Sequence, residues 1–136
     1  MTPDAMATLH AASFTTPRPW SAAEFAQLLA DPLCFSLVES QGFLIGRAVA
    51  GEAEILTLAV APTARRQGVA ARLVQGFLAA ARDRDAASVF LEVAADNAAA
   101  ISLYLQAGFG QTGRRKAYYA QPGAAPRDAL VLARGL

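Results

Sequence analysis

The sequence predicts a mixed α/β sandwich, in which helices cover both faces of a mostly antiparallel sheet. Strand-like runs at 33–39 and 43–49 are separated only by a short turn at 40–42, which is a hairpin signal for antiparallel strands. The segment 54–94 instead has the order strand, helix, strand. Such a unit forms a parallel pair joined by a right-handed crossover. The sheet is therefore expected to combine antiparallel strands with one parallel pair.

Two helices are expected before the first strand. Residues 4–12 carry a short helical pattern of apolar residues. A second helix is expected at 21–30, because Ser21 and Glu24 have the spacing of a capping box and a proline follows the end of the pattern. The side chains of this helix that should face the core are Phe25, Leu28 and Leu29.

The middle of the chain supplies the third strand and the longest helix. The run 54–61 is expected to complete a three-stranded meander with the first hairpin. Pro62 ends this strand, because proline cannot donate to a sheet ladder. After Gly68, apolar residues at helical spacing predict a long amphipathic helix. These apolar residues are Ala70, Leu73, Val74, Phe77, Leu78 and Ala81.

A further strand and helix follow. The apolar run 88–94 is the expected partner of the parallel pair. Asn97 is expected to cap a helix at 98–107, and Gly108 suits the left-handed residue at which such a helix stops. The apolar face of this helix is assigned to Ile101, Tyr104 and Leu105.

The chain is expected to end in a second hairpin and to form one domain. Strand-like runs at 111–119 and 128–134 flank a turn at 121–123. A chain of 136 residues can build one good hydrophobic core, so residues 1–136 are assigned to a single domain.

Composition argues against several classes of function. The net charge is only +1, so bulk charge does not direct the chain to nucleic acid or to a membrane surface. No apolar run is long enough to span a bilayer and the first residues do not resemble a secretion signal, so a cytoplasmic location is expected. His10 lacks metal-ligand spacing, and the single Cys34 is expected to be a buried residue of a reducing compartment.

A strand, a basic loop and a helix start between residues 54 and 71 predict an anion-binding site. Unpaired N–H groups and the helix dipole at a helix N-terminus favour a negative ligand. Arg65 and Arg66 add positive charge, and Gly68 lets a phosphate approach the backbone. The glycine spacings of ATP-binding and dinucleotide-binding loops are both missing. The alternative is an ordinary strand-to-helix turn with surface arginines.

Two residues in the second half of the chain are candidates for chemistry. Glu92 lies in an apolar strand, and Tyr104 lies on the apolar face of the next helix. Because this helix folds back beside the strand, the two side chains are expected to converge near the carboxyl half of the strand. Strand alternation places Glu92 on the face of Phe90 and Ala94, so a solvated charge is the alternative for Glu92. Core packing is the alternative for Tyr104.

With these residues in view, the sequence resembles a known family. Residues 65–70 (RRQGVA) resemble the pyrophosphate loop of the GNAT superfamily of N-acetyltransferases, which bind acetyl-coenzyme A. The segments 91–93, 103–104 and 115–119 resemble the ribosomal-protein alanine N-acetyltransferases (RimI-like) of this superfamily, and so does 19–21. The resemblance covers most of the chain. It implies the GNAT fold, whose one parallel strand pair is splayed at the acetyl-coenzyme A site.

The resemblance implies roles for particular residues. Glu92 would be the general base, acting through water, and Tyr104 the general acid toward the leaving thiolate. Asn97 would contact the coenzyme A arm. The other residues implied in binding acetyl-coenzyme A are Leu58, Ala59, Val60, Arg66, Gln67, Gly68, Val69, Ala70 and Ala71. The residues assigned to the acceptor channel are Tyr118, Tyr119 and Trp20, of which Trp20 has core packing as its alternative.

The implied reaction is direct acetyl transfer from acetyl-coenzyme A to the N-terminal α-amine of a protein, without a metal. The family expectation for the acceptor is the N-terminal alanine of ribosomal small-subunit protein eighteen. An α-amine titrates near ~7.7–8.0 and a lysine near ~10.4, so a single glutamate base suits an α-amine better. An acetyltransferase of a small amine or antibiotic and a non-catalytic coenzyme A-binding module are the alternatives. Neither nucleic acid nor a membrane is expected as a partner, and a monomer is plausible.

Two features depart from the family pattern. The usual first strand is expected to be shortened or missing at the start of the chain. Ala117 stands where a small residue, often glycine, is expected before the tyrosine pair. Neither departure touches the residues assigned to acetyl transfer.

Overall fold

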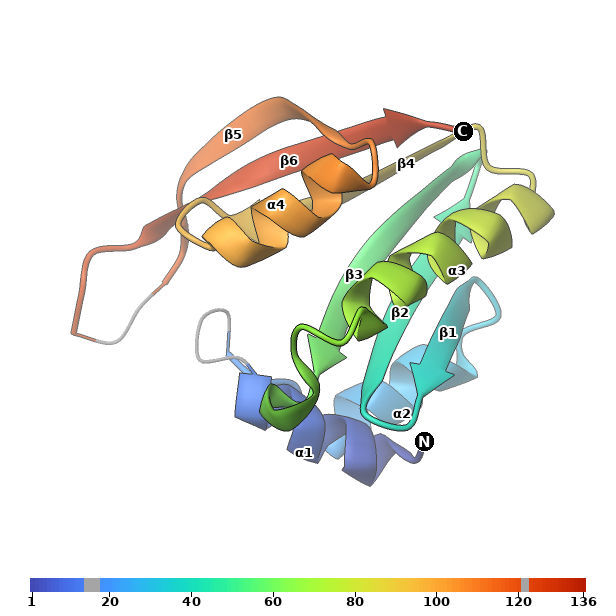
Figure 1. The fold of residues 1–136 in the computed structure, drawn as a ribbon, viewed down its shortest axis with the longest axis horizontal. Helices are drawn as coiled ribbons and strands as arrows, with labels where there is room; N and C mark the ends of the chain where they lie inside the picture. Colours follow the sequence, from blue (N-terminus) through green and yellow to red (C-terminus); the bar gives the residue numbers. More distant parts are fainter. Residues whose placement is uncertain (14–17, 121–122) are drawn as a thin grey trace.

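The computed structural model describes residues 1–13, 18–120 and 123–136, and within them it shows one sheet with helices on both faces (Figure 1). The sheet has six strands in the order β1-β2-β3-β4-β6-β5. The strands are β1 (Cys34–Glu39), β2 (Gly42–Val49), β3 (Glu52–Val60), β4 (Ser88–Ala94), β5 (Gly110–Tyr119) and β6 (Arg127–Gly135). The helices are α1 (Pro3–Ser13), α2 (Ala22–Ala30), α3 (Val69–Asp83) and α4 (Ala98–Gln106), with a short 3-10 helix η1 (Pro62–Ala64) before α3.

This architecture confirms the predicted mixed sheet. β3 and β4 form the parallel pair, and every other neighbouring pair in the sheet is antiparallel. The described residues before β1 form the two predicted helices, α1 and α2. The predicted turn at 121–123 lies partly outside the described residues, but the strands on either side of it pair as expected. None of the described helices is long and apolar enough to cross a membrane.

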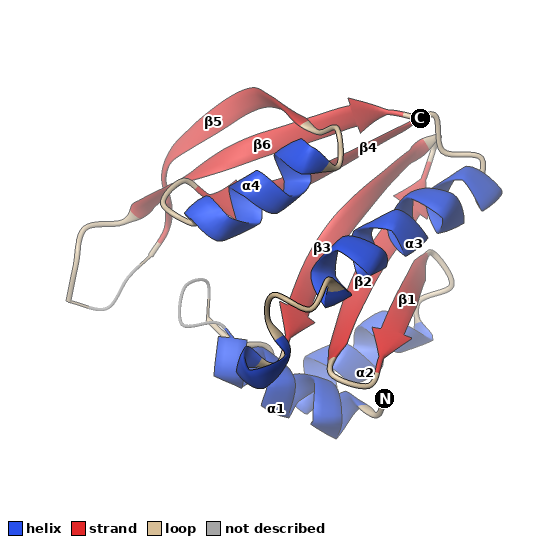
Figure 2. Cartoon of the chain, viewed as in Figure 1, coloured by secondary structure: helices blue, strands red, loops and turns tan. Residues whose placement is uncertain are grey.

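Helices cover both faces of the sheet (Figure 2), and each face has its own cluster of buried apolar side chains. On one face, α3 packs on β1, β2 and β3, and α4 joins the same core through Tyr104. On the other face, α1 and α2 bury Met6 and Phe25 against Phe43 and Ile45 of β2. The larger core of the α3 face includes Leu73, Val74, Phe77, Leu78, Val89 and Leu91.

The parallel pair is short, and this feature positions the site. β3 and β4 are paired over only three residues each, and the last pair joins Glu54 and Phe90. Beyond it, β3 stays beside β2 and β4 stays beside β6, so the two strands diverge (Figure 1). β3 also has one extra residue relative to β2, Leu56, and such bulges bend and twist a strand. The carboxyl halves of β3 and β4 are therefore not paired with each other, and no other strand lies between them.

Three of the predicted side-chain positions are wrong. Leu29 is 38% exposed and Leu105 is 50% exposed, so neither faces the core. Leu28 packs together with Phe25 in the core beneath α1 and α2, whereas Leu29 lies one residue further round α2 and is not part of that core. Cys34 is half-buried rather than buried, because it lies on the edge strand β1. The inward stripe of α4 consists of Ala100, Ile101, Leu103, Tyr104 and Ala107, which leaves Leu105 on the opposite side.

Gly46 of β2 lies beneath two stacked phenyl rings. A Cβ atom at this position would be 2.7 Å from Cζ of Phe35 and 2.8 Å from Cε1 of Phe77, well inside van der Waals contact. We expect Gly46→Ala to lower the free energy of unfolding by about 1–3 kcal/mol, as overpacking does in other cores. Urea unfolding would measure the change. Gly110→Ala is the matched control, because its Cβ would meet no atom within 4 Å, and an equal loss in both variants would contradict the packing explanation.

Candidate functional site

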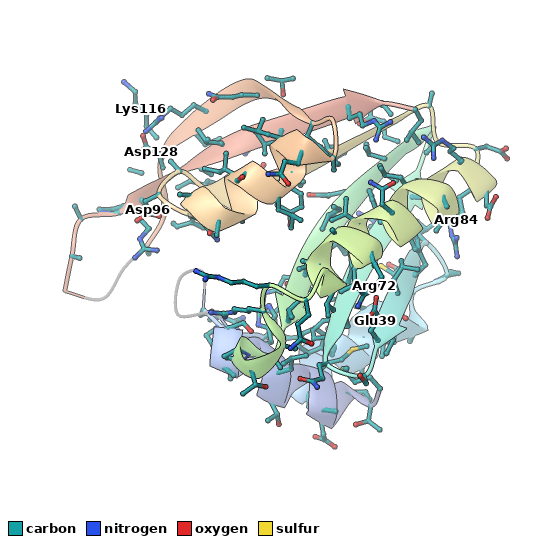
Figure 3. The ribbon with its side chains drawn as sticks, viewed as in Figure 1. Glu39, Arg72, Arg84, Asp96, Lys116 and Asp128 are labelled. Carbon is teal, nitrogen blue, oxygen red and sulfur yellow. The ribbon has the colours of Figure 1, made fainter. Side chains whose placement is uncertain are left out.

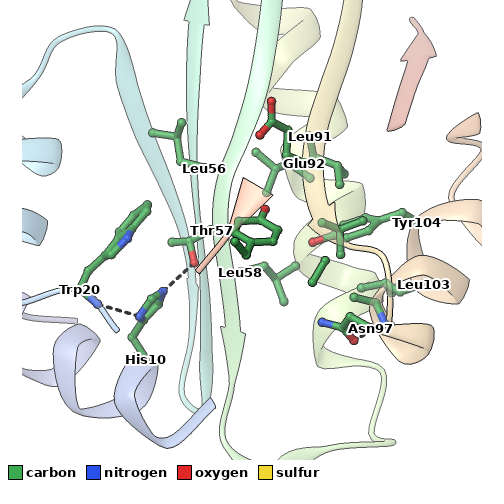
Figure 4. Close-up of a pocket in the computed structure, with 15 residues that line it drawn as sticks. His10, Trp20, Leu56, Thr57, Leu58, Leu91, Glu92, Asn97, Leu103 and Tyr104 are labelled. Atoms are coloured by element: carbon green, nitrogen blue, oxygen red, sulfur yellow. Dashed lines mark hydrogen bonds between the residues drawn. The ribbon is translucent and has the colours of Figure 1, made fainter. Parts of the chain in front are cut away.

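A cavity of about 150 Å³ lies where β3 and β4 diverge (Figure 4). Because it lies between two strands, side chains from both faces of the sheet reach it. Tyr104 enters from α4, on one face, and Glu92 belongs to the other face, opposite the buried Leu91. His10 of α1 and Trp20 form the far wall. The structure thus brings the two candidate residues of β4 and α4 to one cavity.

Glu92 is held in a partly buried cluster of charges. Its side chain is 19% exposed, and its Oε1 forms an ion pair with Nη2 of Arg115, 3.0 Å away. Burial, and then the negative charge of Glu92, raise the pKa of the nearby Glu54 carboxyl. Burial and the same charge raise the pKa of Tyr119 to about 12. Glu92 is therefore a largely covered carboxylate among polar partners, and not the freely solvated charge of the alternative interpretation.

Tyr104 combines core packing with a hydroxyl group at the cavity. Its ring meets Phe109 edge-on, with ring centroids 5.8 Å apart. In Figure 4 its hydroxyl oxygen points toward β3. Burial, with a contribution from Tyr119, raises the pKa of the Tyr104 phenol well above its usual range. The phenol therefore stays protonated and can donate a hydrogen bond into the cavity.

Two further cavities, of about 370 and 230 Å³, continue the first toward the N-terminus of α3. Leu103 of α4 lines all three. Leu58 and Asn97 line both the 150 Å³ cavity and the 370 Å³ cavity. Arg65 and Ala70 line both the 370 Å³ cavity and the 230 Å³ cavity. The three cavities therefore form one groove that runs from Glu92 to the loop before α3.

The backbone of that loop is shaped for an anion. Arg66 has a φ of 65° and Gly68 a φ of 76°, both in the left-handed region. For an arginine this conformation costs free energy, and such strain is concentrated at functional sites. Gly68 is the N-cap of α3 and makes no side-chain hydrogen bond there, so the first N–H groups of the helix need another acceptor. An anion in the groove would meet these N–H groups and the exposed side chains of Arg65 and Arg66.

Arg72 ties this loop to the sheet. It donates from Nη1 to the carbonyl oxygen of Gln67 at 3.0 Å. Its Nε and Nη2 donate to the two carboxylate oxygens of Glu39 at 3.0 and 2.8 Å. Figure 3 shows Glu39 and Arg72 pointing toward each other between β1 and α3. A bidentate pair of this kind holds the Arg72 guanidinium in a fixed geometry, and the bond to Gln67 thereby restricts the loop.

Most of the predicted binding residues lie along the groove. Tyr119 and Trp20 line its first cavity, while the neighbouring Tyr118 is 50% exposed and lies outside it. Gln67 is exposed and lines none of the three cavities. Asn97 also caps α4, because its Oδ1 accepts from the N–H of Ala100 at 3.2 Å. The predicted residues that line the groove are Leu58, Ala59, Val60, Arg66, Gly68, Val69, Ala70, Ala71 and Asn97.

His10, for which the sequence predicted no role, lies in the cavity wall (Figure 4). Its Nδ1 accepts from the backbone N–H of Trp20 at 3.1 Å, which leaves the ring proton on Nε2. Nε2 therefore donates to Oγ1 of Thr57, 2.9 Å away. The ring stacks on the indole of Trp20, with centroids 5.2 Å apart. The available signal was the spacing from Met6 to His10, which puts the histidine on the buried face of α1.

We expect the stability of the protein to fall as the pH decreases through the titration of His10. Burial lowers the pKa of His10 to about 4, against about 6.5 in an unfolded chain. Between these values only the unfolded chain binds the proton, so unfolding is favoured by at most about 1.4 kcal/mol per pH unit. Urea unfolding between pH 7 and 4.5 measures this slope. In His10→Gln the slope should be shallower, since the carboxylates titrate in both proteins, and equal slopes would contradict the assignment.

No three His, Cys, Asp or Glu side chains gather into a metal-binding group in the part of the chain that the structure describes. The candidate site thus consists of a carboxylate, a phenol and an anion loop along one groove.

Known proteins with similar sequences and structures agree with this geometry. The model of the acetyltransferase (GNAT) family matches residues 4–109. Ribosomal protein bS18-alanine N-acetyltransferase of Escherichia coli K12 is 34% identical over 119 residues, which cover 85% of this chain and 80% of that protein. N-alpha-acetyltransferase RimI of Mycobacterium tuberculosis is 35% identical over 137 residues, which cover 94% and 83%.

Solved structures extend the likeness to the fold. The crystal structure of the ribosomal-protein-S18-alanine N-acetyltransferase from Escherichia coli matches with a TM-score of 0.85 at 30% identity. The match covers 98% of this chain and 86% of that chain. The family model, the relatives and the diverging strand pair with its groove therefore confirm the resemblance, and the chain belongs to the acetyltransferase (GNAT) family.

Proposed function

We propose that the protein transfers the acetyl group of acetyl-coenzyme A to the N-terminal α-amine of a protein, and that the acceptor begins with alanine. The observation that supports this function best is the single groove that connects the anion loop before α3 to Glu92 and Tyr104. The names of relatives that match over about four-fifths of their length support an acceptor of the ribosomal protein bS18 type. Such an acceptor would place the reaction in the cytoplasm.

Acetyl-coenzyme A suits this groove in both charge and backbone pattern. Its pyrophosphate would lie at the N-terminus of α3, near Arg66 and Gly68. Beyond Glu54, alternate backbone groups on the β4 side of β3 have no strand partner. They are available to the amides of the pantetheine arm along Leu58, whereas the carbonyl oxygen of Val60 already accepts from Oγ of Ser13 at 3.3 Å. The thioester would then reach the cavity between Glu92 and Tyr104.

We assign the chemistry to direct attack. The amine nitrogen forms a bond to the thioester carbon, and the bond from this carbon to sulfur breaks. Glu92 would accept the proton that the amine loses, through a water molecule. Tyr104 would donate a hydrogen bond to the departing sulfur. Because the pKa of the Tyr104 phenol is raised above that of a thiol, near ~8.5, a hydrogen bond describes its role better than complete proton transfer.

Cys34 is a poor candidate for an acyl-enzyme nucleophile. It lies on β1, separated from β3 by β2. Burial and the nearby Asp31 raise the pKa of its thiol, which disfavours the reactive thiolate. Direct transfer within a complex of both substrates therefore remains the proposed mechanism.

The acceptor would enter from the side of Trp20 and Tyr119. A volume of about 150 Å³ accommodates an amino group with a small side chain, which suits alanine. An α-amine also has a reference pKa near ~8, so roughly a tenth of it is neutral and reactive at pH 7. The pKa of a lysine amine is roughly 2.5 units higher, so the same glutamate would have to remove a proton that is held more tightly.

The test is acetyl-coenzyme A turnover, followed by thiol release and by the mass of the products. Peptides that begin with Ala-Arg, Ser or Met-Leu are compared with an N-blocked peptide that contains a lysine and with a panel of small amines. We expect turnover only on free α-amines, and the highest kcat/KM on alanine. Turnover confined to the lysine peptide or to small amines would replace the proposed acceptor. Binding of acetyl-coenzyme A without any turnover would indicate a non-catalytic module.

A further inference from the structure

β5 is distorted next to the acceptor side of the candidate site, between Arg115 and Tyr119. Arg115 of β5 is paired with Ala129 of β6, and Tyr119 is paired with Arg127. Four steps along β5 thus oppose two steps along β6, so β5 holds two extra residues at this point. Ala117, in the middle of the bulge, has a φ of 52°, which a non-glycine residue rarely adopts. The bulge is therefore strained and needs a partner that holds it.

Asp128 of β6 is that partner. Its Oδ1 accepts from the backbone N–H of Ala117 at 2.8 Å, and its Oδ2 accepts from Nε of Arg114 at 2.7 Å. Its own carbonyl accepts from the N–H of Ala95 at 2.9 Å, so it is anchored at the end of β4. Figure 3 shows Asp128 near Lys116, where β5 and β6 adjoin. One carboxylate thus fixes the bulge at two points.

The residues on either side of the bulge are the ones that reach the candidate site. Arg115, before the bulge, pairs with Glu92 at 3.0 Å, and its guanidinium lies 5.2 Å from the centre of the Tyr118 ring. Tyr119, after the bulge, lines the cavity and meets Tyr118 edge-on with centroids 5.2 Å apart. In a regular strand, Arg115 and Tyr119 would also lie on the same face, but they would stand opposite residues of β6 that are four positions apart. Here they stand opposite Ala129 and Arg127, which are only two positions apart. The bulge draws them together over Glu92.

We propose that Asp128 is a positioning residue that holds this bulge, and thereby places Arg115 and Tyr119 on the acceptor side of the cavity. The inference rests on the proposed function in so far as the cavity receives an acceptor amine. Asp128 lines none of the three cavities of the groove, so it acts through the bulge and not by touching a substrate. The two cavities nearest α3, which would hold the pantetheine arm and the pyrophosphate, contain neither Arg115 nor the bulge, so the binding of acetyl-coenzyme A should be unaffected.

The test uses Asp128→Ala, Ala117→Gly and the double variant in the full chain. Asp128→Ala should raise KM for the acceptor about tenfold and leave KM for acetyl-coenzyme A within about twofold. Glycine adopts a positive φ without strain, so Ala117→Gly should behave like the parent, and the double variant should recover most of the lost acceptor affinity. Asp128→Asn keeps an oxygen for the N–H of Ala117 and should lie between the parent and Asp128→Ala.

The matched control is Asp31→Ala. Asp31 also accepts a backbone N–H with its carboxylate, from Leu33 at 2.9 Å, but in the turn between α2 and β1. Its loss should leave both KM values within about twofold of the parent. A double variant as impaired as Asp128→Ala, or an equal rise of both KM values, would overturn the positioning role.

A readout without catalysis separates this inference from the proposed function. Hydrogen exchange of the Ala117 amide, followed by NMR, should be slow in the parent and at least tenfold faster in Asp128→Ala. An unchanged exchange rate of the Ala117 amide would show that Asp128 does not hold the bulge, whatever the activity of the variant. If the parent acetylates small amines and no peptide, the proposed acceptor fails, and the KM comparison is then made with the amine that it does acetylate.

Discussion

Replacing Glu92 by glutamine should lower kcat by about 10²–10⁴-fold, the usual contribution of a general base. The amide keeps the size of the side chain and can still accept from Arg115, but it cannot take a proton from the attacking amine. Because Arg115 is largely exposed, losing this ion pair should change the free energy of unfolding by no more than about 1 kcal/mol. Initial rates at saturating acetyl-coenzyme A, together with its Kd from calorimetry, measure the effect.

The control for this variant is Glu52→Gln, which removes an exposed carboxylate from the start of β3. It should change neither kcat nor the Kd of acetyl-coenzyme A beyond twofold. If Glu92→Gln weakened acetyl-coenzyme A binding as much as it reduced turnover, Glu92 would be a structural residue of the groove and not the base.

Replacing Tyr104 by phenylalanine should lower kcat by about 10- to 100-fold, the effect of losing one hydrogen bond to a charged group that is made chiefly in the transition state. The phenyl ring keeps its edge-on contact with Phe109, so the packing of α4 is preserved. The missing hydroxyl leaves the negative charge on the departing sulfur without its donor. Single-turnover rates are the right measurement, because they report the chemical step and exclude slow product release.

The KM for acetyl-coenzyme A should stay within about threefold in Tyr104→Phe, because the hydroxyl acts mainly on charge that develops during the reaction. A single-turnover rate equal to that of the parent would remove Tyr104 from the mechanism. It would then be a core residue whose hydroxyl group happens to reach the cavity.

Local patterns in the chain were sufficient for most of the secondary structure. Ser21 and Glu24 form both hydrogen bonds of the predicted capping box, and Asn97 caps α4 as predicted. These features depend on residues three or four positions apart, so neighbours in the sequence determine them. The parallel pair of β3 and β4 followed from connectivity, because a helix between two strands brings the second alongside the first.

The components of the candidate site could be predicted from the sequence, but their arrangement in space could not. Glu92 on a strand and Tyr104 on the next helix could be placed by periodicity and by resemblance. Their shared cavity depends on the early end of the pairing at Glu54 and on the extra residue Leu56 in β3. Neither feature leaves a periodic signal, because each is set by how β3 pairs with two different strands.

The sequence by itself determined the order and type of the main helices and strands, and it predicted an anion site in the loop before α3 and two candidate residues for acetyl transfer. Only the tertiary structure decided that Leu105 is exposed, that His10 is buried against Trp20 and Thr57, and that Asp128 holds the bulge at Ala117. The physical reason is the same in each case. Burial and side-chain contacts arise between segments far apart in the chain, such as α1 with β3. They are therefore fixed by packing across the sheet and not by the pattern within one segment.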